Sequence, residues 1–112
     1  MRSNLLASHG RSLNFLGKRD KRTVPGVRAT AVHRLDGGDV DIRYHGTTLV
    51  RQHPDGTYTV FGGVGSATDK ARINGCSPAR VYQKDFHWYF GDGTPFRTRT
   101  RIDANGIPMV SA

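Results

Sequence analysis

The chain contains no glutamate, one cysteine and one tryptophan, and it has no long run of apolar residues. All nine acidic residues are aspartate. Aspartate favours turns and helix caps, whereas glutamate favours helix interiors. The single cysteine, Cys76, excludes an intrachain disulfide and is typical of a reducing compartment. Without a long apolar run, no segment of the sequence is suited to span a membrane as a helix.

What the chain does contain favours short strands joined by turns. Fourteen of the 112 residues are glycine, and glycine is characteristic of tight turns. A chain of this length supports one domain with a modest hydrophobic core and leaves no room for a second. We expect residues 27–112 to form that single β-rich domain.

The most regular pattern lies in Val40–Phe61, where apolar and polar residues alternate. Val40–Tyr44 places apolar side chains on one face of an extended segment and charged side chains on the other. Leu49–His53 follows as a second strand, and the turn Pro54–Gly56 leads into a third at Thr57–Phe61. Three strands with such short connections predict an antiparallel meander.

Other segments complete the expected fold. One short helix is expected at Ala67–Asn74, because Ser66 or Thr68 can cap its start. Further strands are expected at Val27–Leu35, Arg80–Lys84, His87–Phe90 and Phe96–Ile102. The sequence therefore predicts a mainly β fold, as a small antiparallel barrel or a strongly curved sheet of six to seven strands with one short helix.

Positive charge is concentrated at the N-terminal end. The formal net charge is +8; residues 1–28 hold seven basic residues and one acidic residue, Asp20, and the rest of the chain is nearly neutral. We expect residues 1–26 to be a basic, irregular arm that ends near Pro25. Two interpretations stay open, a solvated flexible tail and an arm that becomes ordered on a polyanion or an assembly partner.

Three alternating arginines form the sharpest local pattern. Arg97, Arg99 and Arg101 would share one face of an extended strand, about 7 Å apart, which suits successive phosphates of a nucleic acid. The same pattern also protects an exposed edge strand from aggregation, and it could face an acidic protein surface. All three interpretations remain open.

Aromatic and helical residues add to this candidate interface. Tyr82 and Tyr89 are expected on one face of a hairpin, where they could stack on bases or close one end of a barrel core. Lys70 and Arg72 are expected to point outward from the helix. These four residues extend the candidate interface.

Enzymatic chemistry finds little support. The histidines lack metal-ligand spacing, and neither CxxC nor HExxH occurs. Gly62–Gly65 precedes a helix but lacks the lysine of a phosphate-binding P-loop. Cys76 follows a helix C-terminus, whose dipole disfavours a thiolate. We therefore expect a protein that is not an enzyme and that needs no metal or cofactor.

Several short motifs together resemble a known group of proteins. They are His45–Thr48, His53–Thr57, Thr68–Asn74, Arg80–Gln83 and His87–Tyr89. With the residues around them, from 27 to 90, they are similar to small uncharacterised proteins encoded by bacteriophages and bacterial mobile elements. The resemblance implies a phage or prokaryotic origin and roles in virion assembly, nucleic-acid handling or interference with host defence. It implies no role for any single residue.

The sequence thus favours a module that binds nucleic acid, DNA or RNA, electrostatically and with little base readout. The alternative is a phage structural or assembly protein, or an inhibitor of a host defence protein, that contacts an acidic surface. In either case we expect it in the bacterial cytoplasm or in the virion, and an oligomer is possible. The candidate contact residues are Arg11, Lys18, Arg19, Lys21, Arg22, Arg28, Lys70, Arg72, Tyr82, Tyr89, Arg97, Arg99 and Arg101.

Overall fold

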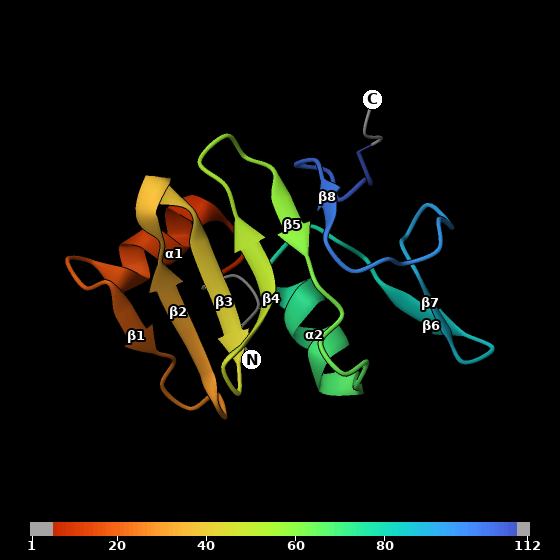
Figure 1. Ribbon diagram of the computed structural model, residues 1–112, viewed down its shortest axis with the longest axis horizontal. Coiled ribbons are helices and arrows are strands. Elements are labelled where there is room, and N and C mark those ends of the chain that lie inside the picture. Colours follow the sequence, from red (N-terminus) through yellow and green to blue (C-terminus); the bar gives the residue numbers. More distant parts are fainter. Residues whose placement is uncertain (1–5, 110–112) are drawn as a thin grey trace.

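The structure is a computed structural model that describes residues 6–109 (Figure 1). Within these residues eight strands and two α-helices follow one another, with one short 3-10 turn. In order they are α1 (His9–Leu16), β1 (Lys21–Thr23), β2 (Thr30–Arg34), the 3-10 turn Asp36–Gly38, β3 (Val40–Tyr44), β4 (Thr47–Gln52), β5 (Tyr58–Val60), α2 (Ala67–Gly75), β6 (Tyr82–Lys84), β7 (His87–Tyr89) and β8 (Thr100–Ile102). The expectation of a mainly β fold is confirmed.

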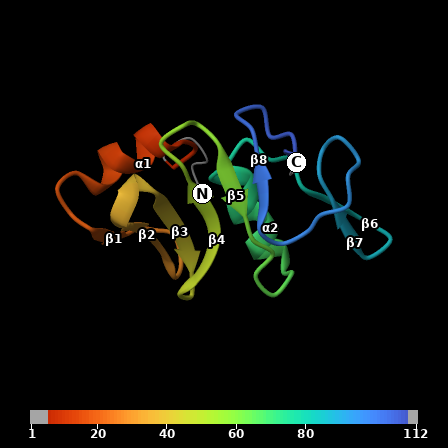
Figure 2. The ribbon, with the colours of Figure 1, turned by 45° about the horizontal axis from the view of Figure 1, so that its top comes forward.

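Six strands form one open antiparallel sheet in the order β1-β2-β3-β4-β5-β8. β6 and β7 form a separate two-stranded ribbon at the far end of the molecule from β1 (Figures 1 and 2). Among the described residues β8 does not pair with β1. The sheet therefore does not close into the barrel that the strand count suggested. The sheet stays open, with β1 and β8 as its outermost strands, and Ile102 of β8 forms an isolated bridge with Pro108.

The predicted meander is present. It has one irregularity, which explains why two adjacent residues of β4 are both buried. The pairing of β3 with β4 shifts between Ile42 opposite Val50 and Arg43 opposite Thr48, so that Leu49 has no opposite residue. Such a bulge re-aims neighbouring side chains. As a result Leu49 and Val50, although adjacent in sequence, are both fully buried.

Both helices pack on the same face of the large sheet (Figure 1). Ser8 caps α1 by accepting a hydrogen bond from the amide of Arg11 (3.2 Å). Ser66 and Asp69 form a capping box at the start of α2. The predicted helix and its Ser66 cap are therefore confirmed, and Ile73 of α2 is fully buried against the sheet.

The described part of the expected N-terminal arm is not irregular. Residues 6–24 contribute α1 and the edge strand β1, and Leu6, Phe15, Leu16 and Val24 belong to the hydrophobic core. Burial of these apolar side chains supplies the free energy that orders the segment, although much of its surface is basic. The expected boundary at residue 26 falls in the β1–β2 connection, and residues on both sides of it share one core. Residues 1–5 of the expected arm lie outside the described residues.

The face of the sheet opposite the helices is polar, and a buried carboxylate organises it. The side chain of Asp41 on β3 has no exposed surface. It accepts hydrogen bonds from Arg51 (2.7 and 3.2 Å), Thr48 (3.0 Å) and Arg43 (3.3 Å). Burial alone raises the pKa of Asp41, but the hydrogen bonds from Arg51 and Thr48 and the charge of Arg51 outweigh it and lower the pKa below its ordinary value.

Removing this carboxylate leaves two arginines without their partner. We expect Asp41→Ala to lower the free energy of unfolding by about 3 kcal/mol at pH 7, as breaking a buried pair usually does. Because the pKa of Asp41 is lower in the folded state, its contribution is present above pH ~4 and is lost as the pH falls through the folded-state pKa. Urea denaturation of both proteins at pH 7 and pH 3 measures this difference.

The exposed carboxylate of Asp20 provides the control, and Asp20→Ala should change stability little. A loss in Asp41→Ala that is equally large at pH 3 and pH 7 would contradict the account, because it would assign the loss to packing rather than to charge.

Cys76 lies in the core just after α2 and is fully buried. Its carbonyl accepts a hydrogen bond from the side-chain amide of Gln52 (2.9 Å), which also donates to the carbonyl of Leu6 (2.6 Å). Gln52 thereby joins β4 to two segments distant in sequence. Burial raises the pKa of the Cys76 thiol to about 12, so at neutral pH it is protonated.

We therefore expect Cys76 to be inert in the folded protein. At pH 8 an aromatic disulfide reagent should modify it only as fast as the protein unfolds, and it should react with one thiol per chain in 8 M urea. Absorbance of the released thiolate measures both rates. Rapid stoichiometric reaction without denaturant would show that the thiol is accessible.

Candidate functional site

The arginine stripe expected at residues 96–102 does not form. Only Thr100–Ile102 pairs in the sheet, and Arg99 has a left-handed backbone with φ 64°. The Thr100 hydroxyl donates to the carbonyl of Arg97 (2.6 Å), which closes a turn where a strand was expected. The expected period-two alternation is therefore interrupted before it reaches Arg101.

Arg101 itself is engaged within the protein. Its guanidinium donates to Asp55 (2.9 Å) and to the hydroxyl of Thr57 (2.8 and 3.0 Å). Arg97 and Arg99 are exposed and form no side-chain hydrogen bond or ion pair with the described residues. Whether the three arginines bind a ligand stays a prediction. Their side chains do not form one row on a single strand face.

The two cations of α2 also differ from expectation. Arg72 does not point outward, because its Nε donates to the hydroxyl of Thr30 (3.1 Å) and its guanidinium lies 5.4 Å from the centre of the Tyr44 ring. Lys70 is half-buried. Arg72 thus helps to hold α2 against the sheet.

The structure does bring together three of the predicted cations at the β1 edge. Arg19, Lys21 and Arg22 line an open groove of about 460 Å³ together with Thr23 and Pro25. We call it the edge groove. No acidic side chain lines it. Arg28, in the β1–β2 connection, and Lys18, just after α1, are exposed but do not line it, and Arg11 is exposed on α1.

Arg22 has a fixed position in the edge groove. It donates to the carbonyl of Phe15 (2.7 Å), and its guanidinium lies 4.3 Å from the centre of that ring. Because Phe15 is a core residue of α1, this contact ties the edge strand to the helix. This hydrogen bond uses one of the five N–H donors of the Arg22 guanidinium.

Arg19 and Lys21, by contrast, keep their charges free. Within the described part of the chain neither side chain forms a hydrogen bond or an ion pair, and both residues are exposed. The neighbouring acid, Asp20, faces Arg34 instead (3.7 Å). Two unpaired cations beside a third fixed one make the edge groove a place where an anion gains charge-assisted hydrogen bonds without displacing an internal partner.

The field at this edge is also felt by a histidine. His33 is the residue opposite Lys21 in the sheet. Burial lowers the pKa of His33, and the charges of Arg43 and Lys21 lower it further, against an opposing effect of Asp41. The pKa of His33 thus lies below its ordinary value, mainly because of burial and secondly because of these two cations.

A row of polar residues crosses the open face in register. Its members, one from each strand, are Lys21, His33, Asp41, Arg51, Thr59 and Arg101. The cations in its middle and at β8 are paired with carboxylates, whereas Lys21 at the β1 end is not. Sequence reasoning missed this row, because alternation shows which face a residue takes but not which strand lies beside it.

A carboxylate–imidazole–hydroxyl chain lies beside this row. His53 shares hydrogen bonds with the carboxylate of Asp39 through Nδ1 (3.0 Å) and with the hydroxyl of Thr59 through Nε2 (2.8 Å). The three groups come from the loop before β3, the end of β4 and the middle of β5. These two hydrogen bonds therefore hold two hairpins together. Among the described residues no three metal-binding side chains gather at one point.

The two predicted tyrosines form a pair at the other end of the molecule. Tyr82 lies opposite Tyr89 in the β6–β7 ribbon, and their rings stack with centroids 5.6 Å apart and planes 26° apart. The expectation that they share a face is confirmed. Neither lies at the β1 edge, which is at the opposite end of the longest axis (Figure 1).

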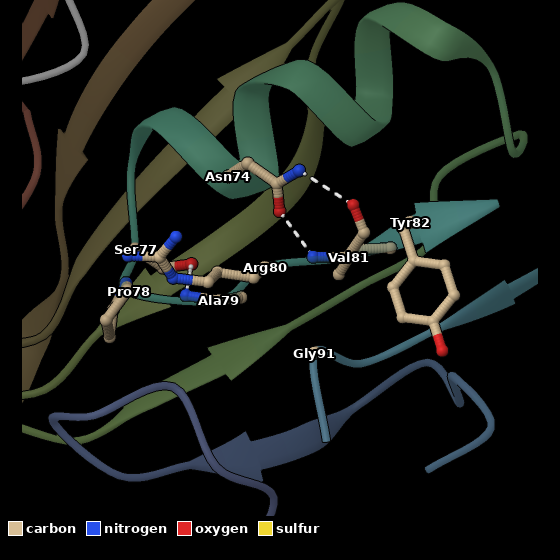
Figure 3. A pocket seen from close by; sticks show the side chains of 8 residues that line it. All are labelled: Asn74, Ser77, Pro78, Ala79, Arg80, Val81, Tyr82 and Gly91. Atoms are coloured by element: carbon tan, nitrogen blue, oxygen red, sulfur yellow. Dashed lines mark hydrogen bonds between the residues drawn. The ribbon is translucent and has the colours of Figure 1, made fainter. Parts of the chain in front are cut away.

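Tyr82 also lines a depression of about 620 Å³ between the end of α2 and the start of β6 (Figure 3). Arg80 lines it too, and sequence reasoning did not select this residue. Arg80 lies only two residues before Tyr82, which sequence reasoning did select.

In the described residues 6–109 no helix has the length and hydropathy of a membrane span.

Comparison with known proteins identifies one family. Residues 18–104 match the family model described as Kyanoviridae Gp96 protein. No curated protein and no solved structure matches the chain. The match includes the edge groove and the Tyr82 depression, and it confirms the expected phage origin, whereas the link to mobile elements stays a prediction. The chain belongs to the Kyanoviridae Gp96 protein family, a phage family of unknown function.

Proposed function

We propose that this phage protein binds nucleic acid without catalysis, and that the edge groove is its main phosphate-binding surface. The observation that carries the proposal is the gathering of Arg19, Lys21 and Arg22 in one groove that no acidic side chain lines. Lys18 and Arg28, both exposed on the adjoining segments, extend the positive surface.

The arrangement suits a phosphodiester backbone better than a small anion. The groove is open and lies along an edge strand, so a long polymer can pass without being threaded. Arginine offers a planar fork that matches two phosphate oxygens, and lysine acts as a compact charge. No aromatic side chain lines the groove, so contact there is with phosphates rather than with bases.

Such binding depends on salt and hardly on sequence. If the groove engages about three phosphates of a duplex, the affinity should fall about 40-fold between ~50 and ~200 mM salt. The host cytoplasm, where phage nucleic acid is replicated and packaged, is the compartment that fits this role, and packaging in the virion is compatible with it.

A second function is favoured by a different observation. Phe86, at the tip of the β6–β7 ribbon, is 94% exposed and has a left-handed backbone with φ 68°. This conformation is unfavourable for a bulky residue, and exposure of the ring adds a second cost. A phage assembly protein, or an inhibitor of a host defence protein, would use such a tip for protein contact. That role leaves the edge groove unexplained.

The first function is tested by removing the two free cations. Arg19→Ala/Lys21→Ala should weaken binding of a fluorescent 20-base-pair duplex by more than about tenfold at ~50 mM salt. The slope of log affinity against log salt should decrease by about two, one unit for each lost phosphate contact. Fluorescence anisotropy from 50 to 300 mM salt measures both values for duplex DNA, duplex RNA and unrelated sequences.

The matched control is Arg97→Ala/Arg99→Ala, which removes the same charge from two exposed arginines outside the groove. It should keep most of the affinity and the full salt slope. Equal losses in the two double variants would contradict the edge groove as a site and leave only a general effect of net charge. An affinity that does not change with salt would refute electrostatic binding altogether.

A further inference from the structure

The depression beside Tyr82 combines three features, its size, its floor and its walls, and the edge groove includes none of them. It holds about 620 Å³, which is within the size range of small-molecule sites. Two apolar and buried lining residues, Ala79 and Val81 (2% and 4% exposed), form what we call its floor. Its walls carry one aromatic ring, from Tyr82, and one cation, from Arg80 (Figure 3).

The floor is rigid because a side chain of α2 forms two hydrogen bonds with its backbone. Asn74 donates through its amide nitrogen to the carbonyl of Val81 (2.9 Å) and accepts from the amide of Val81 (2.8 Å), as the dashed lines in Figure 3 show. This paired contact replaces a strand partner for residue 81. The backbone from which Arg80 and Tyr82 project is therefore held in one conformation.

The aromatic wall is supported from behind. Tyr82 stacks on Tyr89, and Tyr89 does not line the depression. Tyr82 is 41% exposed, so part of its ring remains open to a ligand. A tyrosine that is already stacked on one side loses little freedom when a planar group stacks on it, and a nucleobase gains 5- to 150-fold in affinity from a typical stack of this kind.

The cation is free. Arg80 is exposed, and its side chain forms no hydrogen bond or ion pair with the described residues. Its stem passes over Gly91, where an added Cβ would lie 3.1 Å from the Cβ of Arg80. Arg80 and Tyr82 are two positions apart in extended chain, about 6.6 Å between Cα atoms, and in Figure 3 they extend toward opposite sides of the depression.

We infer that this depression binds a single nucleotide unit, with its base stacked on Tyr82 and its phosphate held by Arg80. A nucleotide joins a planar ring and an anion in one molecule, and the depression offers a partner for each across an apolar floor. The unit comes from a free nucleotide or from an unpaired end of a strand. The depression and the edge groove share no residue, so the two proposals fail independently.

The test is titration of the ¹⁵N-labelled protein with AMP, adenosine, inorganic phosphate and the oligonucleotide dA6. AMP should shift the amides of Ala79, Val81 and Gly91 and should bind at least about tenfold more tightly than adenosine or phosphate. Arg80→Ala and Tyr82→Ala should each weaken AMP binding about 5- to 150-fold, and Tyr82→Phe should retain it.

Two controls separate this site from the rest of the surface. Arg97→Ala should leave AMP binding unchanged, and so should Arg19→Ala/Lys21→Ala, even though the latter lowers duplex binding. Tighter binding of dA6 than of AMP identifies a strand as the source of the unit, and equal affinity identifies a free nucleotide. Phosphate binding as tight as AMP binding, or no shift of these amides at 10 mM AMP, would overturn the proposal.

Discussion

Packing of both helices on one face of the six-stranded sheet is the constraint on which the rest of the structure depends. The covered face takes the apolar side chains, including Val32, Ile42, Val50 and Val60, all of them fully or almost fully buried. No described helix covers the other face, so its polar side chains must form their hydrogen bonds and ion pairs with one another. Asp41 provides such contacts and fixes Arg43 and Arg51 between neighbouring strands. Most of the charge at the centre of this face is thereby engaged internally.

The same constraint determines where charge stays free. A one-sided sheet that does not close leaves two edges, and the basic N-terminal segment supplies one of them as β1. Basic side chains protect an edge strand from unwanted pairing. At β1 they lack acidic partners, whereas at the β8 edge Arg101 is paired with Asp55. Arg80, Arg97 and Arg99 are exposed elsewhere, but at the β1 edge three cations line one groove, and that gathering favours the edge groove as the phosphate-binding surface.

Local patterns were sufficient for part of this fold. Strict alternation predicted the strands around Ile42, and the capping chemistry of Ser66 predicted α2, because both depend on residues adjacent in sequence. Long-range effects were not accessible in the same way. The order of residues 9–24 depends on burial of Phe15 against a distant sheet, and the predicted arginine stripe fails because Arg99 adopts a left-handed backbone. The candidate site followed the same division: six basic residues near the N-terminus were predicted as contact residues from composition alone, and only the folded structure shows that three of them share a groove.

The central claim is that duplex nucleic acid contacts the β1 edge through phosphates. Amide chemical shifts of the ¹⁵N-labelled protein, recorded with a 12-base-pair duplex at ~50 mM and again at ~500 mM salt, test it most directly. The account predicts the largest shifts at residues 18–23 and Arg28, similar for unrelated sequences, and their disappearance at the higher salt. Shifts confined to residues 97–101 or to the β6–β7 ribbon, or no shifts at either salt concentration, would contradict it.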